Sequence, residues 1–402
     1  MSAVRESIQA MVAEKRALRP DEACAAIKEV MAGEATQAQI GAFLVALQVN
    51  PPALAPAGSP SLTPMSFLAF FALFALSSLS HSFSLSLSLS PSLWQGQALD
   101  PELVKECAAA MVSFANPCKV EKPAETMDIV GTGGDGLDTF NVSTAAGMVL
   151  AASGVKCAKH GNRSASGSVG SADFLEALGC NIMLNGDQVA TAVDECGFGF
   201  LFAQMFHPAM KHVGPARKEI GVRTVFNLLG PLTNPAAPGL QVIGVGKKEL
   251  GSLFAELFKL KGAKRAMIVH SSEGLDEISP AAKTHVWLLD EGKISEKEIS
   301  PADFGLDAHK LEDVQGGSAA ERATIFREVV KGGEPPASET PQVRAIRDYI
   351  IINAAPAIYL AGKAKDFKVF SAILFHGGWC RLRSVVQSAR SEACKAGLMR
   401  AW

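Results

Sequence analysis

The stretch from Asp128 to Thr144, DIVGTGGDGLDTFNVST, places glycines and short polar side chains directly behind an apolar run. The run predicts a strand, the glycines a turn, and the residues from Asn141 onward the start of a helix. Glycines let a backbone approach an anion, and helix-initial N–H groups with Asn141, Ser143 and Thr144 supply donors. The pattern indicates a phosphate or pyrophosphate site. It is neither a Walker P-loop nor a dinucleotide-binding motif, and an ordinary glycine-rich turn is the alternative.

A second loop of this kind follows another predicted strand. The sequence KHGNRSASGSVGSADFLEALG, residues 159–179, places Lys159, His160, Asn162 and Arg163 beside a serine- and glycine-rich turn that leads into a helix. A basic, hydroxyl-rich loop next to a first anion-binding turn favours a polyanionic ligand over a purely structural role. His160 taken alone is more typical of a structural histidine.

Two further clusters carry charges that suit a small acidic substrate and a metal ion. Arg217 and Arg223 lie near a proline- and glycine-rich loop, and an arginine can bind a carboxylate through two parallel hydrogen bonds. Asp276 and Glu277 follow a predicted strand, and such paired carboxylates are suitable ligands for Mg²⁺, which prefers hard oxygens. Each cluster taken singly fits a solvated helix face or acidic turn equally well.

The elements that must position these residues alternate between strand and helix from Met127 onward. This rhythm predicts an α/β domain with a largely parallel central sheet. Strands are predicted at 127–131, 155–161, 198–203, 240–246 and 265–272, helices at 144–154, 171–179, 249–262 and 339–362, and a hairpin at 284–301.

The chain before residue 123 has the spacing of short amphipathic helices. Asp21, Thr36 and Asp100 are each expected to cap the N-terminus of one helix. The sequence therefore predicts a small helical domain formed by residues 1–50 and 98–122, followed by the α/β domain.

Two segments depart from this organisation. Residues 35–99 contain no Asp, Glu, Lys or Arg, and residues 51–97 are expected to be a Ser/Leu-rich insertion, either disordered or an artefact of the gene model such as an unspliced intron. Its longest apolar run is too short to span a membrane, so no membrane partner is expected. The α/β domain is predicted at 123–366, and residues 367–402 form an atypical C-terminal segment.

The overall composition excludes several classes of protein. Of 402 residues, 48% are hydrophobic and 19% charged, which excludes global disorder. The 38 basic and 40 acidic residues are balanced, so no nucleic-acid partner is expected. Eight singly scattered cysteines indicate a reducing compartment, and no leader peptide is recognisable, so a cytoplasmic location is predicted. A plastid location with a missing presequence is the alternative.

Four motifs in order, GTGGDGLDTFNVST, KHGNRSASG, HPAMKHVGPARKEIGVRTVFNLLGPLTNP and GLDEISP, resemble the anthranilate phosphoribosyltransferase family. The resemblance covers roughly residues 1–50 and 98–366. It implies the fold of class IV phosphoribosyltransferases and nucleoside phosphorylases, a small helical domain joined to a larger α/β domain, and a homodimer formed through the helical part. It also implies transfer of phosphoribose from phosphoribosyl pyrophosphate to anthranilate in tryptophan biosynthesis, with Mg²⁺ and without a covalent nucleophile.

The same resemblance assigns site residues. Mg²⁺ would bind Ser143, Asp276 and Glu277, and anthranilate would contact Gly131, Asn162 and Arg217, the last through its carboxylate. Phosphoribosyl pyrophosphate would contact the two loops at Gly131, Gly134, Asp135, Thr139, Asn141, Val142, Ser143, Thr144, Lys159, His160, Gly161, Asn162, Arg163, Ser164, Ala165, Ser166, Gly167 and Ser171.

Two other functions fit parts of the pattern. A pyrimidine nucleoside phosphorylase would share the architecture but use free phosphate without a metal, and the KHGNR motif and the acidic pair argue against it. A non-catalytic binding protein, such as a nucleic-acid binder, would need a basic groove, whereas the net charge is −2.

Overall fold

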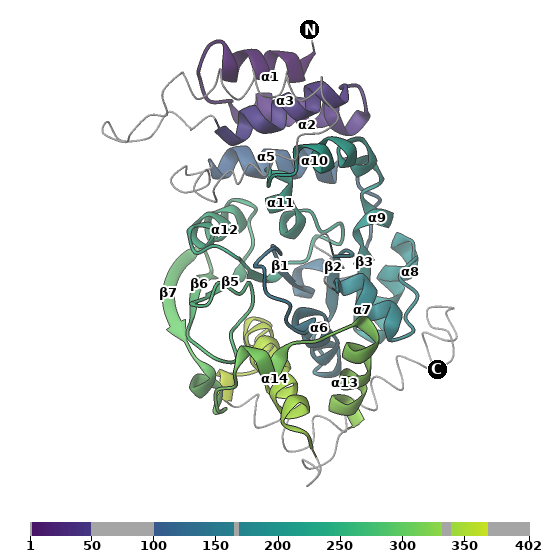
Figure 1. Cartoon of the computed structure of the whole chain (residues 1–402), viewed down its shortest axis with the longest axis vertical. Coiled ribbons are helices and arrows are strands. Elements are labelled where there is room, and N and C mark those ends of the chain that lie inside the picture. Colours follow the sequence, from purple (N-terminus) through teal and green to yellow (C-terminus); the bar gives the residue numbers. More distant parts are fainter. Residues whose placement is uncertain (1, 50–99, 165–168, 332–338, 369–402) are drawn as a thin grey trace, which may run out of the picture.

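The computed structural model describes residues 2–49, 100–164, 169–331 and 339–368. A group of N-terminal helices lies at one end of the molecule, and a larger α/β unit lies below it (Figure 1). This arrangement confirms the predicted fold class. The Ser/Leu-rich segment 51–97 and nearly all of segment 367–402 lie outside the described residues. Among the described residues, no helix is long and apolar enough to cross a membrane.

Within the described ranges 2–49 and 100–122, the N-terminal unit contains four α-helices, α1 (Ala3–Val12), α2 (Pro20–Ala32), α3 (Gln37–Val49) and α5 (Pro101–Val112). Two of the predicted caps are confirmed. The side chain of Asp100 accepts a hydrogen bond from the backbone N–H of Glu102 at 3.0 Å, and the hydroxyl of Thr36 accepts one from Gln39 N–H at 3.3 Å. Short polar side chains therefore satisfy N–H groups that a helix leaves unpaired in its first turn.

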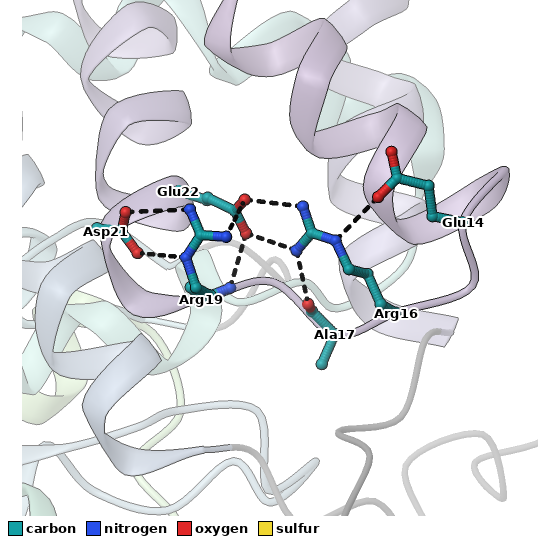
Figure 2. Close-up of polar contacts among 6 residues, drawn as sticks. All are labelled: Glu14, Arg16, Ala17, Arg19, Asp21 and Glu22. Atoms are coloured by element: carbon teal, nitrogen blue, oxygen red, sulfur yellow. Dashed lines mark hydrogen bonds and ion pairs between the residues drawn. The ribbon is translucent and has the colours of Figure 1, made fainter.

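The predicted cap at Asp21 is wrong. Helix α2 begins at Pro20 with Arg19 as its N-cap, because proline has no N–H to lose and its fixed φ suits the first helical position. Asp21 lies in the first turn and pairs with Arg19 at 3.2 Å, while Glu22 binds Arg16 at 2.8 Å (Figure 2). The carboxylates thus stabilise the positive end of the helix dipole.

One seven-stranded sheet, in the order β3-β2-β1-β4-β5-β6-β7, forms the centre of the α/β unit. Strands β1 to β5 are parallel, while β6 and β7 form an antiparallel hairpin at one edge, as predicted. The strands are β1 (Met127–Gly131), β2 (Cys157–Gly161), β3 (Phe198–Phe202), β4 (Leu240–Gly244), β5 (Arg265–Ser271), β6 (Thr284–Asp290) and β7 (Lys293–Ile299). Since β1 lies between β2 and β4, the direction of strand addition reverses there.

Helices cover both faces of the sheet (Figure 1). The α-helices are α6 (Val142–Ala152), α7 (Ser171–Ala177), α8 (Gly186–Thr191), α9 (Ala203–Phe206), α10 (Gly214–Ile220), α11 (Phe226–Leu229), α12 (Glu249–Leu260), α13 (Ala319–Lys331) and α14 (Pro341–Leu360). Shorter 3₁₀ or π turns lie at Pro123–Glu125, Ala192–Cys196, Pro208–His212, Gly230–Leu232, Pro301–Phe304 and Leu311–Val314.

Alternate residues of the central strands contribute to two different hydrophobic clusters. Ile129 and Met267 pack with α6 and α14, whereas Ile243 and Ile268 pack with α12 and with the N-terminal helices. A parallel sheet that is buried on both faces explains why its strands read as continuous apolar runs. The second cluster also joins the helical unit to the sheet without a break.

The close contact of α12 with the sheet gives a stability prediction. A Cβ atom on Gly251 would lie 2.2 Å from the Trp287 ring, whereas a Cβ on Gly41 of α3 would have nothing within 4 Å. Gly251→Ala should lower the free energy of unfolding by about 1–3 kcal/mol through overpacking. Gly41→Ala, the matched helical control, should raise it by about 0.5–1 kcal/mol. Urea denaturation measures both, and equal effects would contradict the predicted packing.

Candidate active site

The site begins where β1 and β4 end side by side. Gly131 and Gly244 are register partners, and Asp276 lies directly over both of them. A Cβ on Gly131 would fall 2.2 Å from the Asp276 carboxylate, and one on Gly244 would fall 1.5 Å from its backbone carbonyl oxygen. Ligands of open α/β sheets bind outside the carboxyl ends of the strands at such a reversal point. Topology therefore brings Asp276 to the glycine-rich loop.

The glycine-rich loop after β1 is held from two sides. Gly133 and Gly134 have φ values of 73° and 74°, in the left-handed region that favours glycine. The N–H of Gly133 donates to Asp276 Oδ2 at 2.6 Å. Arg223 Nη2 donates to the carbonyl oxygens of Gly133 at 3.0 Å and Gly134 at 2.6 Å. Arg223, which the sequence placed only near a loop, thus braces the predicted phosphate loop.

The N-terminus of α6 is open. Asn141 occupies the N-cap position, but its side chain makes no capping hydrogen bond. Its Nδ2 donates instead to the carbonyl oxygen of Val169 at 2.8 Å, which joins the first loop to the second. The buried Thr144 hydroxyl has no hydrogen-bond partner among the described residues. The N–H groups of Ser143 and Thr144 in the first turn therefore face no competing side-chain cap, as an anion site at a helix N-terminus requires.

The three residues expected to bind the metal are brought together. Burial and repulsion from Glu277 raise the pKa of Asp276 well above its usual range. Burial also raises the pKa of Glu277 to about 7, although Lys159 and a hydrogen bond with Ser143 act in the opposite direction. Asp135 adds a third carboxylate that repels both acids. Several hard oxygens thus lie close together in a buried position where a cation would favour their ionised forms, and this donor set fits Mg²⁺.

The protein supplies only part of a coordination shell. In the part of the chain that the structure describes, no group of three or more His, Cys, Asp or Glu side chains is arranged to hold a metal ion by itself. Mg²⁺ commonly uses one or two carboxylates and completes its shell with water and substrate phosphates. The arrangement therefore fits a metal that binds together with a phosphorylated substrate.

Lys159 is buried beneath the loop, with 1% of its surface exposed. Its ammonium donates to the carbonyl oxygen of Ile129 at 2.6 Å and to the Ser143 hydroxyl at 3.4 Å. Asp128 lies nearby, accepts from Asn234 Nδ2 at 2.8 Å, and has its pKa raised to about 6 by burial. Since its hydrogen bonds go to protein groups, Lys159 would act on a ligand mainly through its charge.

His160 and the neighbouring His207 form a buried pair, with ring centroids 5.0 Å apart. His160 Nδ1 lies 3.1 Å from the carbonyl oxygen of Gly230. Burial lowers the pKa of His160 to about 3 and that of His207 to about 4, so both rings are neutral near pH 7. This environment is that of a structural histidine pair at the edge of the second loop.

The second loop is only partly described. Gly161 ends β2, and the N–H of Arg163 donates to Asn162 Oδ1 at 2.8 Å. The N–H of Ser164 approaches Asp173 Oδ2 at 3.4 Å, and Ser171 begins α7. Ala165, Ser166 and Gly167 lie outside the described residues.

Arg163 does not point freely toward a ligand. Its Nη1 forms ion pairs with Asp173 at 2.8 Å and Glu176 at 2.5 Å, both on α7. Its guanidinium carbon lies 5.5 Å from the centroid of the Phe202 ring. The basic character of the second loop is therefore largely neutralised by its own helix, which the sequence pattern alone did not indicate.

Arg217, by contrast, is unpaired among the described residues. It lies on α10, half-buried, and burial lowers the pKa of its guanidinium. Its guanidinium carbon lies 5.9 Å from the centroid of the Phe226 ring, and no hydrogen bond links it to Gly131 or Asn162 in the described ranges. A half-buried arginine without a protein counter-charge is suited to bind a ligand carboxylate.

Three residues that lie close to the candidate site were not identified from the sequence. Asp128 and Asn234 form the buried pair beside Lys159, and Arg322 of α13 hydrogen-bonds to residues that lead into α6. For Asp128, the sequence signal was an aspartate inside the otherwise apolar run DIVG. No sequence signal marked Arg322, because an arginine in an amphipathic helix usually faces solvent.

Residues 123–380 match a sequence family described as the glycosyl transferase family, a/b domain, and residues 6–53 match its helical bundle domain. An anthranilate phosphoribosyltransferase of Xanthobacter autotrophicus is 38% identical over 89% of this chain and 87% of that protein. One from Dehalococcoides mccartyi is 35% identical over 97% of this chain and 99% of that protein. The chain belongs to the anthranilate phosphoribosyltransferase family.

Solved structures of anthranilate phosphoribosyltransferases have the same fold. The enzyme of Thermus thermophilus is 34% identical, with a TM-score of 0.75 over 97% of this chain and all of that one. The Saccharomyces cerevisiae enzyme in complex with PRPP and Mg is 27% identical, with a TM-score of 0.72 over 96% of this chain and 98% of that one. As a member of this anthranilate phosphoribosyltransferase family, the chain combines the helical and α/β parts in the same order.

The buried histidine pair predicts acid sensitivity. The unfolded chain binds protons on His160 and His207 below about pH 6.5, whereas the folded chain does not until about pH 4 and below. The free energy of unfolding is therefore not reduced by these two histidines above about pH 6.5. It decreases as the pH falls below that value, by up to about 1.4 kcal/mol per pH unit for each histidine.

Urea denaturation between pH 7 and 4.5 measures this slope. His207→Gln should reduce the slope by about half of the histidine contribution, because one titrating ring is removed. His285→Gln is the control, since His285 lies on β6, far along the sheet from His207, with its Nε2 2.8 Å from Glu296 of β7. An unchanged slope in His207→Gln would contradict the assigned protonation state.

Proposed function

We propose that this protein transfers the phosphoribosyl group of phosphoribosyl pyrophosphate to the amine of anthranilate, releasing pyrophosphate, as a step in tryptophan biosynthesis. The observation that carries the proposal is the position of the Asp276–Glu277 pair against the glycine-rich loop and the open N-terminus of α6. On this proposal, an anion site and a set of metal-binding oxygens lie together at the ends of β1 and β4. The activities of the related enzymes agree with this assignment.

The reaction breaks the bond between the anomeric carbon and pyrophosphate and forms a bond from that carbon to the amine nitrogen, which loses a proton. Positive charge develops on the ribose while a multiply charged anion departs. The chemistry needs stabilisation of the leaving group and correct placement of the amine, and no covalent nucleophile. The first N–H groups of α6 and the backbone of the glycine-rich loop would bind the phosphates.

Within this proposal each cluster has one task. Ser143, Asp276 and Glu277 would hold Mg²⁺, which when bound would neutralise part of the pyrophosphate charge. Arg217 would bind the carboxylate of anthranilate and, with Gly131 and Asn162, orient its amine. Phosphoribosyl pyrophosphate would lie along the loop from Gly134 and Asp135 through Thr139 to Asn141–Thr144, with the segment Lys159–Ser164 and Ser171 beside it.

We also propose a homodimer formed through the helical unit. Ala42 and Val45 lie half-exposed on α3, a helix with apolar residues on several sides. A helix that is apolar around most of its circumference is normally covered. The cytoplasmic location stays a prediction.

The direct test is the loss of anthranilate fluorescence with phosphoribosyl pyrophosphate, with and without Mg²⁺. The full chain should consume anthranilate only when the metal is present. Replacing both acids, by Asp276→Asn and Glu277→Gln, should lower kcat/KM at least about 100-fold and remove the Mg²⁺ dependence. Asp290→Asn is the control, because Asp290 pairs with Arg265 at 2.8 Å at the end of β6.

Two outcomes would contradict the proposal. A double variant that stays active and responds to Mg²⁺ would remove the acidic pair from the site. A folded wild-type chain that cleaves pyrimidine nucleosides with free phosphate, and leaves anthranilate unchanged, would favour the phosphorylase alternative.

Arg217 gives a substrate-specific prediction. Arg217→Ala should raise the KM for anthranilate about tenfold or more, because a charged hydrogen-bonding partner of the carboxylate is lost. The KM for phosphoribosyl pyrophosphate should change little. Lys218→Ala, at an exposed position of the same helix, is the matched control. Equal increases in both KM values would argue against the assigned role of Arg217.

A further inference from the structure

Arg322 is a fully enclosed arginine at the start of α13, with 1% of its surface exposed. Its Nη1 donates to the carbonyl oxygen of Thr139 at 2.7 Å and to Asn141 Oδ1 at 3.2 Å. Its Nη2 donates to Asp138 Oδ1 at 2.5 Å, and its Nε to the carbonyl oxygen of Gly317 at 2.9 Å. Most of these bonds reach the segment 138–141, which leads directly into α6.

The backbone around Arg322 is built to hold this guanidinium. A Cβ on Gly316 would lie 2.4 Å from Arg322 Nε, so glycine leaves the space that the side chain occupies. Thr139 forms an antiparallel bridge with Gln315, and the N–H of Phe140 donates to the carbonyl oxygen of Val314 at 2.8 Å. The chain before α13 and the chain before α6 therefore form one hydrogen-bonded unit.

The contact with Asn141 explains the open N-terminus of α6. Asn141 occupies the N-cap position, where an asparagine side chain normally accepts a hydrogen bond from the first turn. Here Oδ1 accepts from Arg322 and Nδ2 donates to the carbonyl oxygen of Val169. Arg322 thereby turns the amide away from the helix, and the first N–H groups stay free of a side-chain cap.

The buried positive charge of Arg322 also favours a bound anion at the adjacent loop. Its only carboxylate partner among the described residues is Asp138, whose side chain is 57% exposed and so partly screened by water. The other acceptors are backbone carbonyls and an amide, which carry no full charge. A buried cation with so little compensation is costly, and a polyanion bound at the adjacent loop would offset that cost.

We propose that Arg322 is a positioning residue for the pyrophosphate-bearing substrate. It does not touch the ligand, but it holds segment 138–141 in place and keeps Asn141 from capping α6. The proposal rests on the proposed function of the site. It concerns affinity for the phosphoribosyl donor and leaves the binding of the amine substrate unaffected.

The test compares Arg322→Met, which removes the donors and the charge, with Arg322→Lys, which keeps the charge but loses the planar fork. Arg327→Met is the control, because Arg327 lies on the same helix and donates to the carbonyl oxygen of Ala177 at 3.1 Å. Isothermal titration with Mg²⁺ and inorganic pyrophosphate measures affinity without turnover. Steady-state kinetics of the full chain measure the two KM values.

Arg322→Met should weaken pyrophosphate binding and raise the KM for phosphoribosyl pyrophosphate about tenfold or more, with the KM for anthranilate changed less than about twofold. Arg322→Lys should give an intermediate loss. Arg327→Met should bind pyrophosphate like the wild type. Unchanged pyrophosphate affinity in folded Arg322→Met, or a loss of equal size in Arg327→Met, would overturn the proposal.

A second variant keeps the test decisive if Arg322→Met folds poorly. Gly316→Ala retains the arginine but displaces its guanidinium, and it should weaken pyrophosphate binding in the same direction. If the Gly316→Ala protein is folded and binds pyrophosphate as tightly as the wild type does, the proposal fails. The proposed function fails separately, if the wild-type chain does not consume anthranilate in the presence of phosphoribosyl pyrophosphate and Mg²⁺.

Discussion

The close approach of Asp276 to the ends of β1 and β4 is the constraint on which the site depends. Gly131 and Gly244 are register partners, and a side chain on either one would occupy the space of Asp276. The carboxylate also accepts a hydrogen bond from the N–H of Gly133, which is part of the glycine-rich loop that we propose binds phosphate. The acidic pair and this loop are therefore joined directly.

The protein compensates the ionised forms of these carboxyl groups only in part. Burial raises the pKa values of Asp276 and Glu277, while Arg217 lies half-buried without a counter-charge among the described residues. A divalent cation would relieve the first group, and a carboxylate would relieve the second. Since the metal and the polyanionic substrate would each offset the charge of the other, the two are expected to bind cooperatively at these strand ends.

The features that depend on residues close together in the chain were predictable from the sequence. Apolar runs marked β1 to β5, and glycines with short polar residues marked both loops, because these patterns depend on near neighbours. The cap at Asp21 was wrong because Pro20 fixes the helix start two residues earlier, with Arg19 as the N-cap. Strand order and long-range contacts were not predictable: Arg322 lies 183 positions from Thr139, and only the folded chain shows that they touch.

Long-range hydrogen bonds also link the helical unit to the proposed substrate sites. Gln37 of α3 bonds to the backbone on both sides of the start of α10, at His212 and Ala216, so the helix that carries Arg217 is tied to the N-terminal helices. A few residues later, Arg223 donates to the carbonyl oxygens of the glycine-rich loop. One short segment thus connects the helical unit, the arginine we assign to anthranilate and the loop we assign to pyrophosphate. The packing of α3 is therefore linked to both proposed substrate sites by hydrogen bonds from the Gln37 and Arg223 side chains to backbone groups.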